Sequence, residues 1–281
     1  MTDYRPAPLR TKVLIWSVAA LFQVMSGTLQ ADSPDEEELA GWNPVTMRLG
    51  MYLLEADTTF GLKKDGGGIE LVNLDRLGVK KDDTSPWISG VWRFGRKWSL
   101  FLSAFRYDED GFGVWEIDFD FGDITFPAGA QSYARLATDF YLVDTAYTFI
   151  RTPQHELLLG FGIYGVDIKA EFEARVNEIE INNKRFDFLA PLPNGIVKYS
   201  WKISDHWAWH SSLGWFGLSY DKYSGSLINF STSFEYSFND HWGMGLGYSG
   251  VDMDLEIQDG ELTEIYDINI GGVFAYLSLQ F

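Results

Sequence analysis

The chain has 281 residues, of which 46% are hydrophobic and 16% aromatic, and its formal net charge is −18 at pH 7. Such an acidic surface cannot neutralise phosphates, which argues against nucleic acid as a partner. The absence of cysteine excludes disulfides and thiolate metal sites. Eleven Trp, fourteen Tyr and twenty-one Phe favour a protein that crosses membrane–water interfaces many times.

Residues 1–31 have the pattern of a secretory signal peptide. Three basic residues precede an apolar run over 13–25, and residues 26–31 offer a cleavage position. The apolar run is shorter than the roughly 18 residues that a spanning helix needs, although an uncleaved anchor is the alternative. Cleavage removes three basic residues and one acidic residue, so the charge moves from −18 to about −20.

The next segment, 32–43, is an acidic N-terminal segment that we expect in the periplasm, with its first seven residues unstructured. Residues 44–281 then show four similar chain reversals. Each places a short polar turn beside aromatic residues, as the periplasmic hairpin ends of a membrane barrel require. These reversals are 94–98, 151–155, 203–207 and 238–242.

Between the turns, apolar and polar residues alternate with period two, which is the pattern of strands with one apolar and one polar face. A β-sandwich also alternates, but its outer face would be the polar one. We therefore predict an all-β fold, a single antiparallel transmembrane β-barrel. Its ten strands are expected near 45–56, 87–94, 98–107, 136–150, 156–168, 195–203, 207–219, 227–238, 242–252 and 270–281. Eight or twelve strands remain open, because 67–77 and 113–126 can be read as strand or loop.

The last predicted strand ends on Phe281, with Leu279 and Leu277 on the same face. A terminal aromatic on an alternating strand resembles the C-terminal signature of Gram-negative outer-membrane β-barrels. The resemblance implies recognition by the barrel assembly machinery, contact with outer-membrane lipid and lipopolysaccharide, and a periplasmic N-terminus. Upstream, Gly271 and Gly272 break the parity, and we expect a bulge there.

The remaining segments are predicted to be extracellular loops, three of them long. They are 57–86, 108–135, 169–194, 220–226 and 253–269. One of them holds an acidic cluster, Glu116, Asp118, Asp120 and Asp123, which could bind a divalent cation through several oxygens. Same-face neighbours on a strand stand almost 7 Å apart, so a solvated acidic face is the preferred interpretation.

Two further groups bear on chemistry. His210 and Ser212 share a face, and their spacing resembles the His-x-Ser of lipid A deacylases, with Glu235 as a conceivable acidic partner. Leu213 stands where that family has Asn, so a hydrogen-bond network in the lumen is the favoured interpretation. Charges of both signs are expected in the lumen, where they either pair into a plug or line a thin channel: Arg48, Arg93, Asp144, Lys198, Lys202, His210 and Glu235.

The leading functional hypothesis is a non-enzymatic outer-membrane barrel without a cofactor. Its long acidic extracellular loops would bind a ligand, a cation or surface polysaccharide, and its lumen would hold at most a narrow pore. The alternatives are a small-solute channel and a lipid A-modifying enzyme that uses His210 and Ser212. The pattern does not define an oligomeric state.

Overall fold

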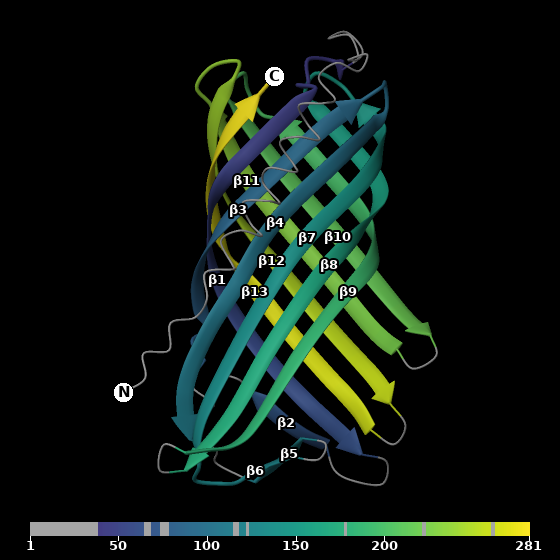
Figure 1. Cartoon of the computed structure of the whole chain (residues 1–281). Coiled ribbons are helices and arrows are strands. Elements are labelled where there is room, and N and C mark those ends of the chain that lie inside the picture. Colours follow the sequence, from purple (N-terminus) through teal and green to yellow (C-terminus); the bar gives the residue numbers. More distant parts are fainter. Residues whose placement is uncertain are drawn as a thin grey trace.

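The computed structural model describes residues 39–64, 69–73, 79–114, 118–121, 124–176, 179–220, 223–259 and 262–281. Within these residues, ten long strands form one antiparallel sheet that closes on itself where the last strand pairs with the first (Figure 1). The strands are β1 (Val45–Lys64), β3 (Asp82–Phe94), β4 (Trp98–Val114), β7 (Gln131–Arg151), β8 (His155–Val176), β9 (Ile179–Lys202), β10 (Trp207–Tyr220), β11 (Tyr223–Ser237), β12 (Trp242–Asp259) and β13 (Leu262–Gln280).

Three short strands lie outside the closed ring. β2 (Ile69–Asn73) pairs with the last part of β1, and β5 (Phe119–Phe121) forms a separate hairpin with β6 (Ile124–Phe126). The prediction of a ten-stranded antiparallel barrel is confirmed. No helix of the described residues is long and apolar enough to cross a membrane.

The four predicted turns gather at one end of the barrel, together with the start of β1 and the C-terminal Phe281. We call this the near end and the opposite one the far end. At the near end, the Phe281 N–H donates to the Val45 carbonyl at 2.9 Å, which continues the closing ladder to the last residue. In the near half, neighbouring strands are paired all the way round the ring, as a spanning sheet requires. Further out, the pairing of β9 with β10 ends at Gly195, and that of β3 with β4 ends at Ile88.

The strands run further toward the far end than the alternation predicted. Pairing of β8 with β9 continues to Val176 and Ile179, and pairing of β12 with β13 continues to Asp259 and Leu262. The expected loops 169–194 and 253–269 are therefore mostly strand. The same is true of most described residues in the other three expected loops, 57–86, 108–135 and 220–226. The prediction of long loops was wrong because these stretches still alternate, but with the opposite phase.

β13 shows this change of phase directly. Val273 and Leu277 point outward and are exposed, whereas Ile268 and Ile270 point inward and are buried. The register against both β1 and β12 is unbroken through Gly271 and Gly272, so the expected bulge is absent. The apolar face changes sides because the surroundings of the barrel change along its axis. In the near half the apolar side chains face outward, toward lipid, whereas in the far half they must face inward, away from water.

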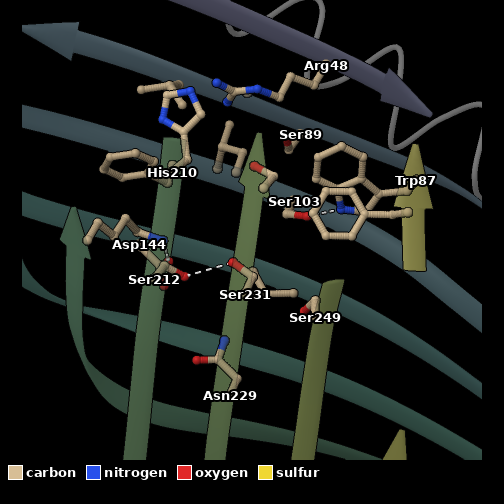
Figure 2. A pocket seen from close by; sticks show the side chains of 18 of the residues that line it. Arg48, Trp87, Ser89, Ser103, Asp144, His210, Ser212, Asn229, Ser231 and Ser249 are labelled. Carbon is tan, nitrogen blue, oxygen red and sulfur yellow. Dashed lines mark hydrogen bonds and ion pairs between the residues drawn. The ribbon is translucent and has the colours of Figure 1, made fainter. Parts of the chain in front are cut away.

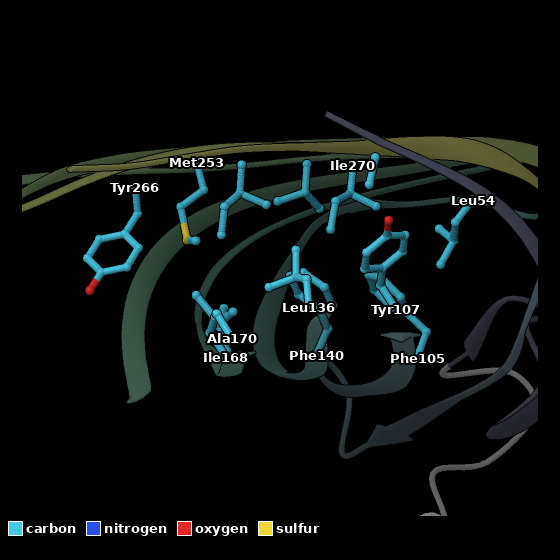
Figure 3. Close-up of a cluster of buried hydrophobic side chains, with 14 of the residues drawn as sticks. Leu54, Phe105, Tyr107, Leu136, Phe140, Ile168, Ala170, Met253, Tyr266 and Ile270 are labelled. Carbon is cyan, nitrogen blue, oxygen red and sulfur yellow. The ribbon is translucent and has the colours of Figure 1, made fainter. Parts of the chain in front are cut away.

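The interior of the far half is accordingly an apolar core. Side chains from opposite walls, such as Met253 on β12 and Leu136 on β7, face one another across the barrel (Figure 3). Phe105 stacks on Phe140 at 4.6 Å between ring centroids, and Leu136, Phe140 and Val166 are fully buried. This half therefore resembles a water-soluble barrel filled by side chains.

The outer wall marks the same boundary. On the outer face of β12, the Leu246 side chain is 60% exposed in the isolated chain. Asp254 lies on the same face eight residues further along the strand. On β4 and β7, an outward ion-pair group follows the apolar belt, with Arg135 Nη2 2.8 Å and Arg106 Nη2 3.2 Å from the Asp108 carboxylate. The apolar belt fits lipid, and the charged band beyond it fits water.

Cysteine labelling tests this boundary in a chain that has no cysteine of its own. In reconstituted vesicles, Asp254→Cys is expected to react with a hydrophilic maleimide, because its side chain lies beyond the lipid. Leu246→Cys on the same face and Ile268→Cys in the core are expected to stay unlabelled. Rapid labelling of Leu246→Cys would contradict the placement of the belt.

Candidate functional site

The near mouth of the barrel is covered by the segment that precedes β1. This mouth segment, Leu39–Pro44, buries Leu39 completely and leaves Trp42 only 4% exposed. The Trp42 indole N–H donates to the Thr152 carbonyl at 2.8 Å, and Lys202 Nζ donates to the Gly41 carbonyl at 2.6 Å. The segment is thus fixed to the β7–β8 turn and to the end of β9.

Beneath the mouth segment lies a buried ion-pair group. The Arg93 guanidinium meets the Glu156 carboxylate with N–O distances of 2.9 to 3.3 Å, and Arg151 Nη2 lies 2.8 Å from the same carboxylate. Glu156 is completely buried. Arg93 also donates to the Asn43 carbonyl at 2.7 Å, so the ion pairs and the mouth segment support each other.

A second buried group centres on Glu235. Its carboxylate accepts hydrogen bonds from Arg48 Nε at 3.0 Å and the Tyr276 hydroxyl at 3.0 Å. Ser278 and Gln280 donate to its other oxygen at 3.1 and 2.6 Å. Four donors around one carboxylate offset much of the cost of removing its charge from water.

The structure places every predicted lumen residue on the inner face, and it pairs most of their charges. Besides the Arg48–Glu235 pair, Lys198 Nζ lies 2.9 Å from Asp144 Oδ2, and Lys202 holds the mouth segment. His210 Nε2 stands 3.9 Å from Glu235 Oε2, beyond hydrogen-bond distance. Of the two arrangements left open by the sequence, the described charges form the paired one.

The His210–Ser212 pair expected for an enzyme is replaced by other contacts. His210 Nδ1 is 2.8 Å from the Ser200 hydroxyl, and the Ser212 hydroxyl is 3.2 Å from that of Ser231. Because Ser212 makes its hydrogen bond on the side away from the imidazole, a mechanism with His210 as its base lacks the contact it requires.

A cavity of about 180 Å³ lies between these ion pairs and the far core (Figure 2). Strands β13, β1, β3 and β4 line it with aromatic rings, among them Trp87, whose centroid is 5.0 Å from that of Phe274. Strands β7 to β11 line it with polar groups, among them Asp144, Ser212 and Asn229. The cavity therefore has an aromatic wall and a polar wall.

The outer wall of the far half carries an acidic face built by β1, β12 and β13. Asp254 lies directly opposite Asp267 in the ladder, and Asp252 and Asp57 flank them. Burial, and then the charges of Asp254, Asp252 and Asp57, raise the pKa of Asp267 above its usual value. The acidic face consists of Glu55, Asp57, Asp252, Asp254, Glu256 and Asp267, all exposed.

Other predicted site residues lie elsewhere or outside the described residues. Glu116 and Asp123 are not described, nor is the side chain of Asp120, whereas Asp118 accepts a hydrogen bond from the Ala128 N–H at 2.8 Å. Leu277 and Phe281 of the assembly signal are half exposed on the outer wall at the near end, with Leu279 between them.

Several site residues were missed by the sequence analysis. Glu156 follows directly on a turn, and its inward parity, shared with Leu158, is the signal that would have revealed it. Ser200 shares the parity of Lys198, so the same reasoning would have placed its side chain in the lumen. The mouth segment gave no signal, since a single Trp outside the alternation does not indicate where it packs.

Comparisons with known proteins bear on the fold. The outer membrane protease OmpT from Escherichia coli matches with a TM-score of 0.54 and 10% identity over 85% of this chain and 97% of that one. The chain has the fold of a Gram-negative outer-membrane β-barrel. The translocator domain of the autotransporter NalP from Neisseria meningitidis also matches, with a TM-score of 0.46 and 13% identity over 97% of this chain and 100% of that one. The Pseudomonas putida toluene transporter TodX matches with a TM-score of 0.29 and 9% identity over 85% of this chain and 90% of that one. No protein-family model and no curated protein matches the chain.

Removing the charge of Glu156 should destabilise the barrel strongly. Glu156→Gln leaves Arg93 and Arg151 without their carboxylate in a buried site, which costs about 3–5 kcal/mol of unfolding free energy. Lys81→Met is the control, because its partner Asp57 is exposed and such pairs contribute about 0–1 kcal/mol. Urea unfolding in lipid vesicles measures both; equal effects would contradict the buried pair.

The acidic face predicts a pH dependence of stability. Because the pKa of Asp267 is raised in the folded state, folding becomes less favourable as pH rises from about 4 through that raised value. Asp267→Asn should therefore stabilise the barrel at pH 7 by about 0.2–1 kcal/mol, and the gain should disappear at acid pH. Asp205→Asn, in a near-end turn, is the control. A stability gain of the same size and pH dependence in that variant would show that the acidic face is not the source of the gain in Asp267→Asn.

Proposed function

We propose that this protein is an outer-membrane barrel that conducts no solutes and binds cationic partners through the acidic face of its projecting far half. The observation that carries the proposal is the change of phase along the strands. It leaves an outer wall that carries charged groups on β1, β4, β7, β12 and β13 around an apolar core, and such charged groups are stable in water rather than in lipid. The far half is then the part that the barrel presents to the exterior.

The orientation follows from the same features. In this proposal the near end, with its short turns and Phe281, faces the periplasm, and the N-terminal segment lies there as well. The apolar belt contacts outer-membrane lipid, and the charged band on β4 and β7 reaches the lipopolysaccharide layer. Binding is assigned to the strands, since loops are short where β8 meets β9 and where β12 meets β13.

Two barriers support the absence of conduction. The mouth segment and the Arg93–Glu156–Arg151 group cover the near mouth, and the apolar core fills the described interior of the far half. An ion that entered from the near end would meet a stretch without polar partners, and its desolvation cost would be prohibitive. Opening the near mouth alone leaves the second barrier in place.

Planar bilayer recordings test the proposal. The wild-type barrel and Trp42→Ala, which loosens the mouth segment, should both give no discrete conductance steps, while an open porin in the same membrane does. In the same preparations, Mg²⁺ should raise the unfolding midpoint of the wild type more than that of a triple variant with Asp252→Asn, Asp254→Asn and Asp267→Asn. Steps from the wild type, or equal Mg²⁺ responses, would contradict the proposal.

A further inference from the structure

The central cavity contains buried polar groups that have no partner. Asp144 Oδ1, Asn229 Oδ1 and the Tyr164 hydroxyl all belong to residues that line the cavity, and none of them forms a hydrogen bond. Asp144 and Tyr164 are at least 98% buried. Buried polar atoms without partners are costly, so several of them in one place mark this wall as a site rather than as simple packing.

These groups lie close together because two glycines make room for them. A Cβ on Gly162 would lie 2.0 Å from Asp144 Oδ1 and 2.9 Å from Asn194 Oδ1, and a Cβ on Gly214 would lie 2.2 Å from Asn229 Oδ1 and 3.0 Å from Asn194 Nδ2. Both amide atoms of the buried Asn194 are also without partners. The unpartnered atoms thus form one cluster across β7, β9 and β11.

The charge of the cavity limits what the cluster can hold. Arg48, Arg93 and Lys198 line the cavity together with a single acid, Asp144, so a cationic ligand is disfavoured. The two arginines are already bound to Glu235 and Glu156, and Lys198 is bound to Asp144, so an anion would find each of these three cations already paired. A neutral molecule that donates hydrogen bonds satisfies both limits.

The opposite wall argues against water alone as the occupant. Trp87, Tyr52, Phe105 and Phe274 present rings to the cavity, with Trp87 Nε1 already bound to the Ser103 hydroxyl at 3.0 Å. About six waters would fit the volume, but those against the rings would lack the two to four polar partners that an ordered water needs. A molecule with one apolar face and one hydroxylated edge matches both walls.

We infer that the cavity is a binding site for a neutral, polyhydroxylated ring of hexose size. The volume of 180 Å³ is appropriate, since a cavity of about 150 Å³ accommodates benzene. The ring lies against Trp87 and Phe274, and its hydroxyl groups face Ser212, Asn229 and Ser231 on the polar wall. Arg93, which lines the cavity and holds the mouth segment, lies between this site and the near end. The site is separate from the acidic face and does not depend on its role.

Tryptophan fluorescence and saturation-transfer NMR of the full-length barrel, in a detergent without a sugar headgroup, test the inference. The probes are glucose, galactose and myo-inositol as neutral rings, and glucosamine and glucuronate as charged rings of the same size. At least one neutral ring should bind, and the charged rings should bind about tenfold more weakly or not at all. Failure of all three neutral rings, or a preference for a charged one, would overturn the inference.

Two matched variants locate the site. Asn229→Leu, inside the cavity, should weaken binding by about tenfold or more, whereas Asn269→Leu, on the outer wall of β13, should leave it unchanged. Ser212→Ala provides a milder change should Asn229→Leu not fold, and it should weaken binding in the same direction. Equal binding by wild type, Asn229→Leu and Ser212→Ala would place the ring elsewhere and refute the site.

Discussion

Closure of the sheet between β1 and β13 is the constraint on which the rest of the molecule depends. In lipid, a strand edge would leave backbone N–H and C=O groups without partners, so the first and last strands must pair along their whole length. Their register runs from Thr46 with Gln280 to Lys64 with Leu262. Once the ring is closed, every strand has an inner and an outer face, and each face must match its surroundings at every height.

That requirement explains the division of the interior. In the near half, lipid takes the apolar side chains, so the inner face carries polar and charged groups that must satisfy one another in a narrow space. Arg93, Glu156 and Arg151 do so in one group, and Arg48 and Glu235 do so in another. In the far half the apolar groups turn inward and form a core. The cavity lies where the two kinds of interior meet, which is why it has one aromatic and one polar wall.

Much of this could be read from the sequence, because period-two alternation and the aromatic turns are local signals. They gave the fold class, ten strands, the near-end turns and the inward direction of Arg48, Lys198 and Glu235. The reversal of phase at Gly271 and Gly272 indicates a bulge only if one solvent surrounds the outer wall along its whole length, whereas the surroundings of this wall change from lipid to water. Partners on adjacent strands, such as Ser200 on β9 for His210 on β10, depend on register between strands and have no local signal. The same holds for the mouth segment, whose contacts come from four distant parts of the chain.

The mouth segment also bears on the order in which the barrel forms. The Asn43 side chain bonds to Gln280, 237 positions away, and Val45 pairs with the final residue. Its other anchors, Arg93, Thr152 and Lys202, come from separate strands or turns of the ring. The segment that precedes the first strand can therefore complete its contacts only after the last strand has closed the ring, although the chain presents it early. The entropy lost in closing so long a loop makes the contact with Gln280 form late and slowly. The complete set of contacts of the mouth segment thus marks a closed barrel, and a chain truncated before Gln280 would leave this segment without part of its support.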